Sequence, residues 1–277
     1  MPPSPDTGPF ATVGEAAISV LLTSDADAKA DLAQKVGAAW ADGALRFAFG
    51  DAPPADRPAR PDRPELRLPR DMPRRRAGGE KGRFALLHSL AHIELNAIDL
   101  AFDMVARFGP DQPREFTSDW IKVGSEEGKH FNLLNDRLKA LAGTYGDLPA
   151  HDGLWDAAFA TRHDLLARLA VVPMVLEARG LDVTPPMIDK LVRAGDEASA
   201  EILGIIYEDE KDHVAAGSRW FASEIAAQKL DATATFHELV RRYFKGDLKR
   251  PFNDAARTAA GLSAGLYEPL ADTPKSS

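Results

Sequence analysis

Hydrophobic side chains recur at spacings of three and four residues along most of the chain, and this period predicts helices rather than strands. The two clearest stretches run over residues 83–107 and 115–142, and Pro110 and Pro113 separate them. Two more helical stretches follow after residue 160. The expected fold is therefore all-α, a four-helix bundle with peripheral helices at the N- and C-terminal ends of the chain.

Charged side chains stand in the middle of these apolar stripes. Glu94 falls on the stripe of the first stretch, and Glu127 and His130 continue the apolar seam of the second. Glu210 and His213 do the same after a run of Ile and Leu. Solvent-facing charges would need the opposite helical phase, so the pattern predicts that these five side chains point into the core. The apolar positions of the first stripe are Phe84, Leu87, Ala91, Ile98, Phe102 and Val105.

Four helical segments carry these residues in the order Glu, Glu-x-x-His, Glu, Glu-x-x-His along the chain. The lone Glu of the third segment is Glu177. Residues three apart share a helix face, so each Glu-x-x-His pair can present an oxygen and a nitrogen to one point. This is the ligand order by which a four-helix bundle holds two metal ions. Chance gives roughly 0.4 such pairs at this Glu and His content, so two in the right order are informative. The predicted metal ligands are Glu94, Glu127, His130, Glu177, Glu210 and His213.

Charge and donor type indicate which metals these side chains would hold. Four carboxylates balance two divalent cations, whereas burying them without a partner would be costly. Mixed carboxylate and imidazole donors suit iron or manganese. We therefore expect two metal ions, with iron as the first choice and manganese or a mixed manganese and iron pair as alternatives. The sequence contains no cysteine, which excludes disulfides, thiolate zinc sites and iron–sulfur clusters.

Three neighbouring residues are candidates for supporting the ligands. Metal-bound imidazoles usually donate their second nitrogen to a carboxylate or carbonyl. Glu126 and Asp209 each precede a ligand Glu directly, with Asp209 the better candidate, and Tyr207 lies three residues before Glu210. For Tyr207 two alternatives stand equally: its side chain faces the metal site, or it belongs to the ordinary hydrophobic core. We expect His88 and His92, at the edge of the first stripe, to be structural histidines rather than ligands.

The segment lengths suggest how the helices follow one another. The first two stretches are expected to be antiparallel neighbours that bring Glu94 and Glu127 level. Residues 143–160 would then cross the length of the bundle, so that the third helix, from about Thr161, runs parallel to the second. Pro173 removes one backbone hydrogen bond and should kink or bulge that helix beside Glu177.

A break in the helix is expected shortly after this point. Gly180 would end the third helix, and Thr184 followed by two prolines would start a short connecting helix near residues 187–194. The fourth long helix, with Glu210, would follow. A peripheral helix near residues 236–244 comes next, and the Ala- and Gly-rich tail is expected to pack on the surface and then become disordered.

These elements suggest a domain organisation in four parts. Residues 1–50 form a helical extension with Ser24-Asp25 as a helix start, and residues 51–82 form an extended arm rich in Pro and Arg. Residues 83–230 form the dimetal bundle, and residues 231–277 form a helix and the tail.

The arm carries a local positive charge. Ten Lys or Arg residues and only four acids lie between Arg57 and Arg83. A basic strap that binds RNA is one interpretation. The alternative is an arm wrapped on the bundle, with its Arg side chains paired to surface acids. We favour the second, because no aromatic residues are interleaved for base stacking.

The whole chain is acidic, with a formal net charge of -8 and a pI near 5.4. This charge argues against general affinity for nucleic acid or acidic lipid. Residues 1–8 lack the pattern of a signal peptide, and the longest nearly apolar run, residues 165–176, contains Arg168 and is too short to span a membrane. The expectation is a cytoplasmic protein with no membrane contact.

Three segments carry a resemblance to a known family. These are residues 86–100, with the stretch Ala91-His92-Ile93-Glu94-Leu95, residues 175–182 and residues 209–214. They resemble a bacterial ferritin-like family catalogued as domain of unknown function 455, and the resemblance extends over most of the chain. It implies a ferritin-like fold and no settled activity. More distantly, the pattern is similar to the di-iron monooxygenase that hydroxylates a tRNA adenosine, and the six predicted ligands fall where that group places its own.

Three classes of function follow from two such metals. The first is an oxygen-dependent oxidase or hydroxylase of an unknown small organic substrate, supplied by an unknown electron donor. The second is iron oxidation or peroxide removal, as in storage proteins, and the third is a structural metal site in an interaction module. About a hundred residues in the arm and end helices would crowd the packing of a storage cage. The first class is therefore preferred, and a tRNA base is one possible substrate.

Overall fold

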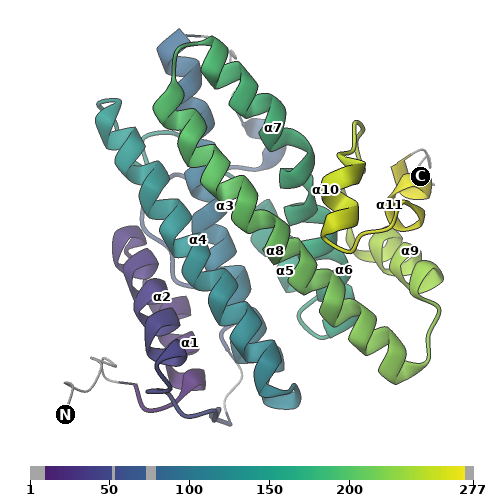
Figure 1. The fold of residues 1–277 in the computed structure, drawn as a ribbon. Coiled ribbons are helices and arrows are strands. Elements are labelled where there is room, and N and C mark those ends of the chain that lie inside the picture. Colours follow the sequence, from purple (N-terminus) through teal and green to yellow (C-terminus); the bar gives the residue numbers. More distant parts are fainter. Residues whose placement is uncertain (1–9, 52–53, 73–78, 272–277) are drawn as a thin grey trace. The chain divides into compact units, whose positions relative to one another are not determined.

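The computed structural model describes residues 10–51, 54–72 and 79–271 (Figure 1). The chain divides into two compact units, Met1–Asp156 and Ala157–Ser277, and each is described below by itself. The described residues are helical, and their β-structure is limited to two isolated bridges, Thr12 to Arg46 and Leu66 to Ala150. Among these residues, no helix has the length and apolar character that a membrane crossing requires. The expected all-α class is confirmed.

The described part of the first unit is built on α1 (Val13–Leu22), α2 (Ala26–Ala41), α3 (Gly79–Phe108) and α4 (Arg114–Ala140). The last two match the predicted stretches closely. The short helical turns η1 (Pro69–Asp71) and η2 (Gly109–Asp111) lie in the connections. Each helix of the N-terminal pair starts with a side-chain cap, and Asp25 accepts a hydrogen bond from the backbone of Ala28 at 2.8 Å, as the sequence indicates.

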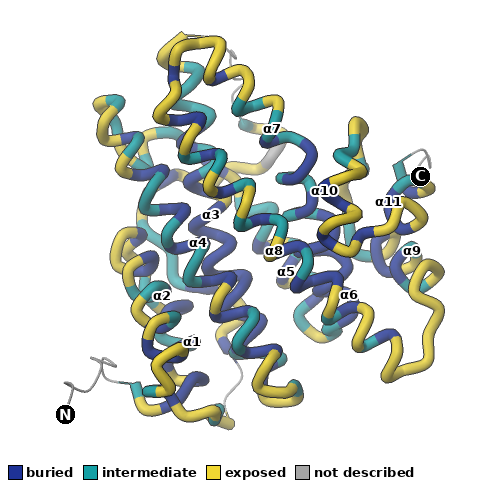
Figure 2. The backbone as a smooth tube through the Cα atoms, in the orientation of Figure 1, coloured by how far each residue is buried: buried dark blue, intermediate teal, exposed yellow. Residues whose placement is uncertain are grey.

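Small residues bring the helices of this unit close together. A Cβ added to Gly124 of α4 would lie 2.7 Å from the ring of Phe102 on α3, and one added to Gly128 would lie 2.7 Å from the carbonyl oxygen of Ala30 on α2. Figure 2 shows that α2 and α4 each bury one side and expose the other. The N-terminal helices, expected on the outside of the bundle, therefore share a core with α3 and α4, and Val13, Ala30 and Ala33 are fully buried in it.

The arm lies along the first unit without regular structure over most of its described length. Its backbone pairs with the loop after α4, where Arg67 donates to the carbonyl of Ala150 at 2.8 Å. Arg57 forms an ion pair with Asp152, and Arg60 lies 3.0 Å from Asp99 of α3. For these two arginines the structure shows the pairing with acids that the second interpretation of the arm requires. The run Arg74–Arg76 lies outside the described residues.

A longer series of helices forms the second unit. They are α6 (Leu165–Val171), the π-helix η3 (Val172–Glu177), α7 (Ala178–Arg193), α8 (Glu197–Gln228), α9 (Ala232–Tyr243), α10 (Asp254–Ala259) and α11 (Ala264–Ala271). The helix α5 (Gly153–Ala160) contains the boundary between the units. The boundary falls inside residues 83–230, so the assignment of that range to one continuous bundle, and the crossover within it, stays a prediction.

The predicted break near Gly180 is wrong, because α7 continues through Pro185 and Pro186 to Arg193. Pro185 has no N–H, so the carbonyl of Leu181, four residues earlier, loses its helical donor. The side-chain amide of Asn253 donates to that carbonyl at 3.1 Å instead. A residue from the C-terminal region thus supplies the hydrogen bond that proline removes.

The C-terminal region is also more ordered than expected. Residues 254–271 form α10 and α11 rather than a disordered tail, and α11 packs on α9. Leu262, Leu266 and Tyr267 are buried here. The segment is rich in Ala and Gly, and only a few large side chains such as these bury its helices. The sequence pattern therefore predicts less helical structure here than the segment forms.

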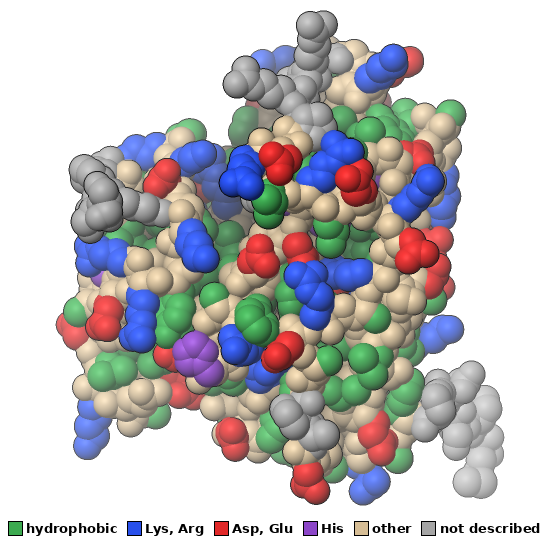
Figure 3. Space-filling model, turned by 180° about the vertical axis from the view of Figure 1, so that it is seen from behind, with side chains coloured by type: hydrophobic (Ala, Val, Ile, Leu, Met, Phe, Trp, Pro, Cys, Tyr) green, Lys and Arg blue, Asp and Glu red, His purple; other side chains and the backbone are tan. Residues whose placement is uncertain are grey.

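The surface charge is mixed. Figure 3 shows one face of the molecule, on which basic and acidic side chains are interspersed with apolar ones. The acidic excess of the chain is thus spread over many side chains and not held in one acidic field on that face.

Candidate metal centre

Two helices of the first unit bring three predicted ligands together. Glu94 comes from α3, and Glu127 and His130 come from α4, one turn apart. The His130 Nδ1 lies 3.3 Å from Glu127 Oε2 and 3.4 Å from Glu94 Oε2. One ligand atom from each of the three lies within 4.8 Å of the others. A cluster of this size and donor type could hold a metal ion.

The pairing of α3 with α4 explains this convergence. The helices are joined by a short connection and pack side by side, with Gly124 against Phe102 at one level and Gly143 against Phe84 at another. This antiparallel register places Glu94 within about one turn of His130. The polar residues predicted on the apolar stripes therefore face one another inside the unit.

The cluster is buried. Glu127 and His130 have no exposed surface and Glu94 is 4 % exposed. Burial raises the pKa of Glu94 well above its ordinary value, the negative charge of Glu127 raises it further, and the contact with His130 opposes both. The Oε2 atom of Glu94 has no hydrogen-bond partner among the described residues. A buried carboxylate oxygen that lacks a hydrogen bond and lies next to a second carboxylate is suited to bind a cation.

The second unit carries the other three predicted ligands. His213 and Glu210 lie one turn apart on α8, with His213 Nδ1 at 3.6 Å from Glu210 Oε1 and both side chains buried. Glu177 is the last residue of the π-helix η3. A Cβ on Gly217 of α8 would collide with Pro173. Because Glu177 follows Pro173 by one turn and His213 precedes Gly217 by one turn, this antiparallel contact sets the two at the same level.

The irregularity expected at Pro173 is present. Residues Val172–Glu177 form a π-helix, in which Pro173 stands near the start. Proline removes one donor from the helical ladder, and a wider turn absorbs the mismatch. The sequence prediction of a kink or bulge beside Glu177 is therefore confirmed.

The structure places the six predicted ligands in two groups of three, one in each unit. Their meeting at a single centre stays a prediction, because the two units are described separately. Within the first unit the prediction of convergence holds for Glu94, Glu127 and His130.

The three candidate supporting residues have different surroundings. Glu126 is partly exposed and lies 3.8 Å from Lys122, one turn earlier on α4. Tyr207 accepts a hydrogen bond from the Asn253 side chain at 3.1 Å, a contact that fixes the C-terminal region to α8. Asp209 is half-buried on the same helix. A supporting role toward the ligands stays a prediction for all three.

The histidines on α3 are structural, as expected. His88 Nε2 accepts hydrogen bonds from the backbone N–H groups of Gly146 and Leu148, at 2.9 and 3.3 Å. His92 contacts the Tyr145 hydroxyl at 2.8 Å and the carbonyl of His151 at 3.0 Å. Both rings thus hold the loop after α4 against α3.

Sequence reasoning missed a buried polar group on the same helix. Asp99 has no exposed surface and lies 2.5 Å from Lys29 of α2 and 3.0 Å from Arg60 of the arm. Burial raises the pKa of Asp99 and lowers the pKa of Lys29, and their mutual attraction opposes both shifts. The signal available was Asp99 and Asp103 one turn apart on a helix that is otherwise apolar at these positions. Their partners are far away in sequence, so the pairing itself could not be found.

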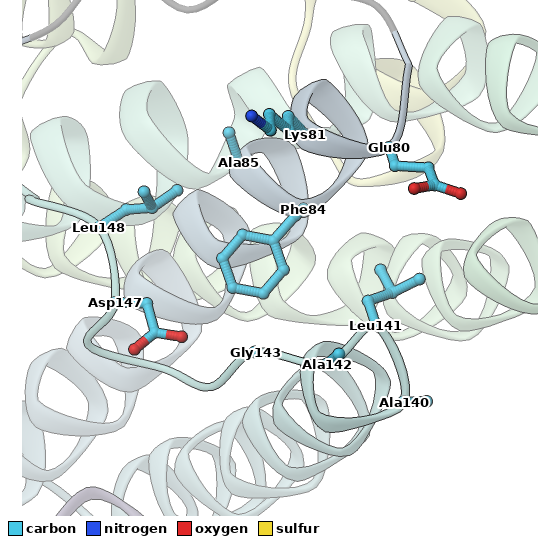
Figure 4. Close-up of a pocket in the computed structure, with 10 residues that line it drawn as sticks. All are labelled: Glu80, Lys81, Phe84, Ala85, Ala140, Leu141, Ala142, Gly143, Asp147 and Leu148. Atoms are coloured by element: carbon cyan, nitrogen blue, oxygen red, sulfur yellow. The ribbon is translucent and has the colours of Figure 1, made fainter.

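A cavity of about 610 Å³ opens near the first turns of α3 (Figure 4). The ring of Phe84 points toward Gly143, with Leu141 and Leu148 on either side, and Lys81 and Asp147 are also among the residues that line the cavity. Phe84 precedes Glu94 by ten residues on α3, about 15 Å along the helix axis. The cavity is therefore separate from the buried carboxylate cluster.

Comparison with known proteins provides a family but no activity. A model of the family described as "Protein of unknown function (DUF455)" matches residues 22–268. A protein of Haemophilus influenzae (strain ATCC 51907 / DSM 11121 / KW20 / Rd), named "Uncharacterized protein", is 44% identical over 209 residues, which cover 73% of this chain and 73% of the relative. No solved structure matches the chain.

Proposed function

The chain belongs to the DUF455 family, whose description assigns no activity, and from the chemistry of its buried side chains we propose that it is a ferritin-like dimetal carboxylate protein. In this proposal two metal ions, with iron as the first choice, serve an oxygen-dependent oxidase or hydroxylase that acts on a small organic substrate. The observation that carries the proposal is the buried cluster of Glu94, Glu127 and His130.

The cluster supports a metal site for an energetic reason. Two carboxylates that share a dry site repel each other, and one of them must hold a proton or meet a cation. The Oε2 atom of Glu94 makes no hydrogen bond of good geometry among the described residues, and the His130 imidazole at 3.4 Å is shared with Glu127. The site is therefore built for a positive charge.

The second set of ligands is proposed to complete the centre. Glu177, Glu210 and His213 repeat the composition of the first set, and the contact of Pro173 with Gly217 brings Glu177 level with His213. The chain order of the six also agrees with the ligand order of dimetal bundles. We propose that Glu210 approaches the cluster of the first unit, and that the four Glu and two His together bind two divalent ions.

Iron held by such donors would supply activation of dioxygen. The residues of the chain have other tasks: the carboxylates neutralise the cations, the imidazoles fill the remaining positions, and the apolar side chains around them exclude water. Phe102, Phe131 and Ile98 are fully buried on α3 and α4, the helices that carry the cluster. A dry surrounding of this kind protects reactive intermediates from hydrolysis and proton leakage.

The direct test is metal content combined with oxygen chemistry. We expect about two irons per purified chain, as the six-ligand pattern requires. Reduction without air followed by exposure to oxygen should give an absorption band of an oxo-bridged iron pair and consume oxygen. Iron accumulation far beyond two per chain would instead favour the iron-oxidising or storage class.

A pair of variants tests the assignment of the ligands. Glu127→Ala should lower the iron content by at least one ion per chain, because it removes a fully buried carboxylate from the cluster. Glu115→Ala, an exposed position near the start of the same helix, is the matched control and should leave iron content unchanged. Equal iron content in the two variants would disprove the metal centre.

A further inference from the structure

A strongly basic segment lies in the second unit, at the end of α9. Residues 241–250 read Arg-Arg-Tyr-Phe-Lys-Gly-Asp-Leu-Lys-Arg, five cations and one acid in a chain of net charge -8. Arg241, Arg242 and Lys249 are exposed, and their side chains form no ion pair with an acid of the described residues. Arg250 of this segment pairs with Glu268, whereas Arg241, Arg242 and Lys249 give the surface a local positive potential that attracts negatively charged partners.

Aromatic and planar side chains lie among these cations. The guanidinium of Arg242 lies 5.2 Å from the ring centroid of Tyr243. The ring of His163 meets the same tyrosine edge-on at 5.9 Å, with Nε2 at 3.3 Å from the Tyr243 hydroxyl. One residue earlier, Arg162 lies 3.8 Å over the ring of Phe159, which is 37% exposed. The end of α9 and the turn before α6 therefore present cations and flat rings together.

We propose that this surface, here called the α9 edge, binds single-stranded nucleic acid. Its cations would contact phosphates and its rings would stack on bases. The α9 edge consists of Phe159, Arg162, His163, Arg241, Arg242, Tyr243, Lys245 and Lys249. The proposal is independent of the metal centre, because none of these residues belongs to the predicted ligand set.

Neither the helix dipole nor an acidic protein partner accounts for the whole α9 edge. Cations in the last turn of a helix interact favourably with its free carbonyls, which accounts for Arg241 and Arg242 on α9 but not for Lys249 or the exposed rings of Phe159 and His163. An acidic protein partner would use the cations, yet its carboxylates would not stack on the rings. The aromatic residues therefore favour bases over carboxylates.

The arm provides a comparison within the same chain. It carries more cations than the α9 edge, but Arg57 and Arg60 are paired with acids and no aromatic residue stands among its basic positions. Aromatic residues among the cations are the criterion for nucleic-acid binding in both places. The arm lacks them, and the α9 edge has them.

The test is fluorescence anisotropy with labelled single-stranded RNA and DNA oligonucleotides of about 15 nucleotides, a length that covers one binding surface of this kind. Binding should weaken with added salt, with a slope of about -0.7 in log K against log salt for each phosphate contact. Comparing the two oligonucleotides shows whether the sugar matters. If neither the RNA nor the DNA oligonucleotide bound at low salt, the proposal would be overturned.

Charge-reversal variants locate the site. Arg241→Glu combined with Arg242→Glu should weaken binding at least about tenfold, because two cations are lost and two anions gained. The control is Arg67→Glu combined with Arg70→Glu, the same charge change on the exposed arm. If both pairs weaken binding equally, the effect is one of net charge and the α9 edge is not the site.

Variants of Tyr243 test stacking separately from charge. Tyr243→Ala should weaken binding about tenfold with an unchanged salt slope, whereas Tyr243→Phe should bind like the parent chain. Thermal melting of each variant reports whether the fold is intact. Tighter binding of poly-glutamate than of either oligonucleotide, or insensitivity to Tyr243→Ala in a folded variant, would show a partner of another class.

Discussion

The two helical pairs that carry the predicted ligands are built differently. In the first unit α3 and α4 are regular, and glycines let them pack closely. In the second unit the helix that reaches Glu177 contains a π-turn and then two prolines within α7, and it is held by contacts from the C-terminal region. The regular pair is stabilised by packing of the apolar faces of its own two helices. The irregular helix depends on side chains from elsewhere in the chain.

The largest expected effect concerns the contact by which the C-terminal region holds α7. Arg257 of α10 forms a buried ion pair with Asp182 of α7 at 2.7 Å, and Asp182 has a fully buried side chain. Arg257→Ala would leave this buried carboxylate with only Arg179, a partly exposed side chain at 3.2 Å, as its cation, and should destabilise the chain by about 3 kcal/mol. Chemical denaturation measures the change.

The exposed pair of Arg250 with Glu268 is the control for this prediction. Arg250→Ala should cost about 1 kcal/mol or less, because water screens exposed charges. If the two variants were equally stable, the C-terminal region would not hold α7, and the contrast between the units would fail.

A second prediction concerns pH and the first unit. Burial lowers the pKa of His92 to about 4, so the folded chain keeps this ring neutral where the unfolded chain protonates it. The unfolded state then binds more protons between pH 4 and about 6.5, and stability falls as the pH drops through this window, by about 3 kcal/mol in total. His92→Gln should flatten this part of the stability curve. An unchanged slope in the variant would contradict the assignment.

The close contact at the π-turn gives a smaller effect with a matched control on the same helix. Gly217→Ala places a methyl group against Pro173 and should cost about 1–3 kcal/mol, because the packed core must shift. Gly204→Ala on α8 meets nothing within 4 Å and should stabilise the chain by about 0.5–1 kcal/mol. Opposite signs in thermal melting confirm the contact, and equal signs would refute it.

The smallest expected effect concerns the side-chain amide of Asn253. Asn253→Ser keeps a side-chain oxygen for the start of α10 but loses the amide that donates to the carbonyl of Leu181 and to the Tyr207 hydroxyl, and should cost about 1 kcal/mol. In a Pro185→Ala background the backbone N–H is restored, so the same substitution should cost less. A double-mutant cycle measures the coupling. Equal costs in both backgrounds would show that Asn253 does not replace the lost donor.

Local signals predicted the regular part of the molecule well. The two stretches with an uninterrupted period became α3 and α4, and the Asp25 cap marked the start of α2. Glu94, Glu127 and His130 were found because their phase on the helices put charged side chains where only apolar ones are expected. The π-turn followed from a single proline in a helical pattern.

Prediction from the sequence failed where a distant residue decides a local outcome. The proline pair predicted a helix break, yet α7 continues, and Asn253 donates to the Leu181 carbonyl that Pro185 leaves without a helical donor. The tail was expected to pack on the surface and then become disordered, and residues up to 271 form helices with buried side chains such as Tyr267. Neither contact leaves a trace in the local pattern, since the partners are separated by many residues.

By itself, the sequence determined the helical class, the faces of the long helices and the donor types on them, because these depend on spacing and side-chain chemistry alone. Only the tertiary structure decided that Glu94, Glu127 and His130 lie within reach of one cation, and that buried partners such as Lys29 and Asp99 meet across the unit. The reason is physical: helical phase is set by neighbouring residues, whereas the level at which two helices meet is set by packing between distant ones.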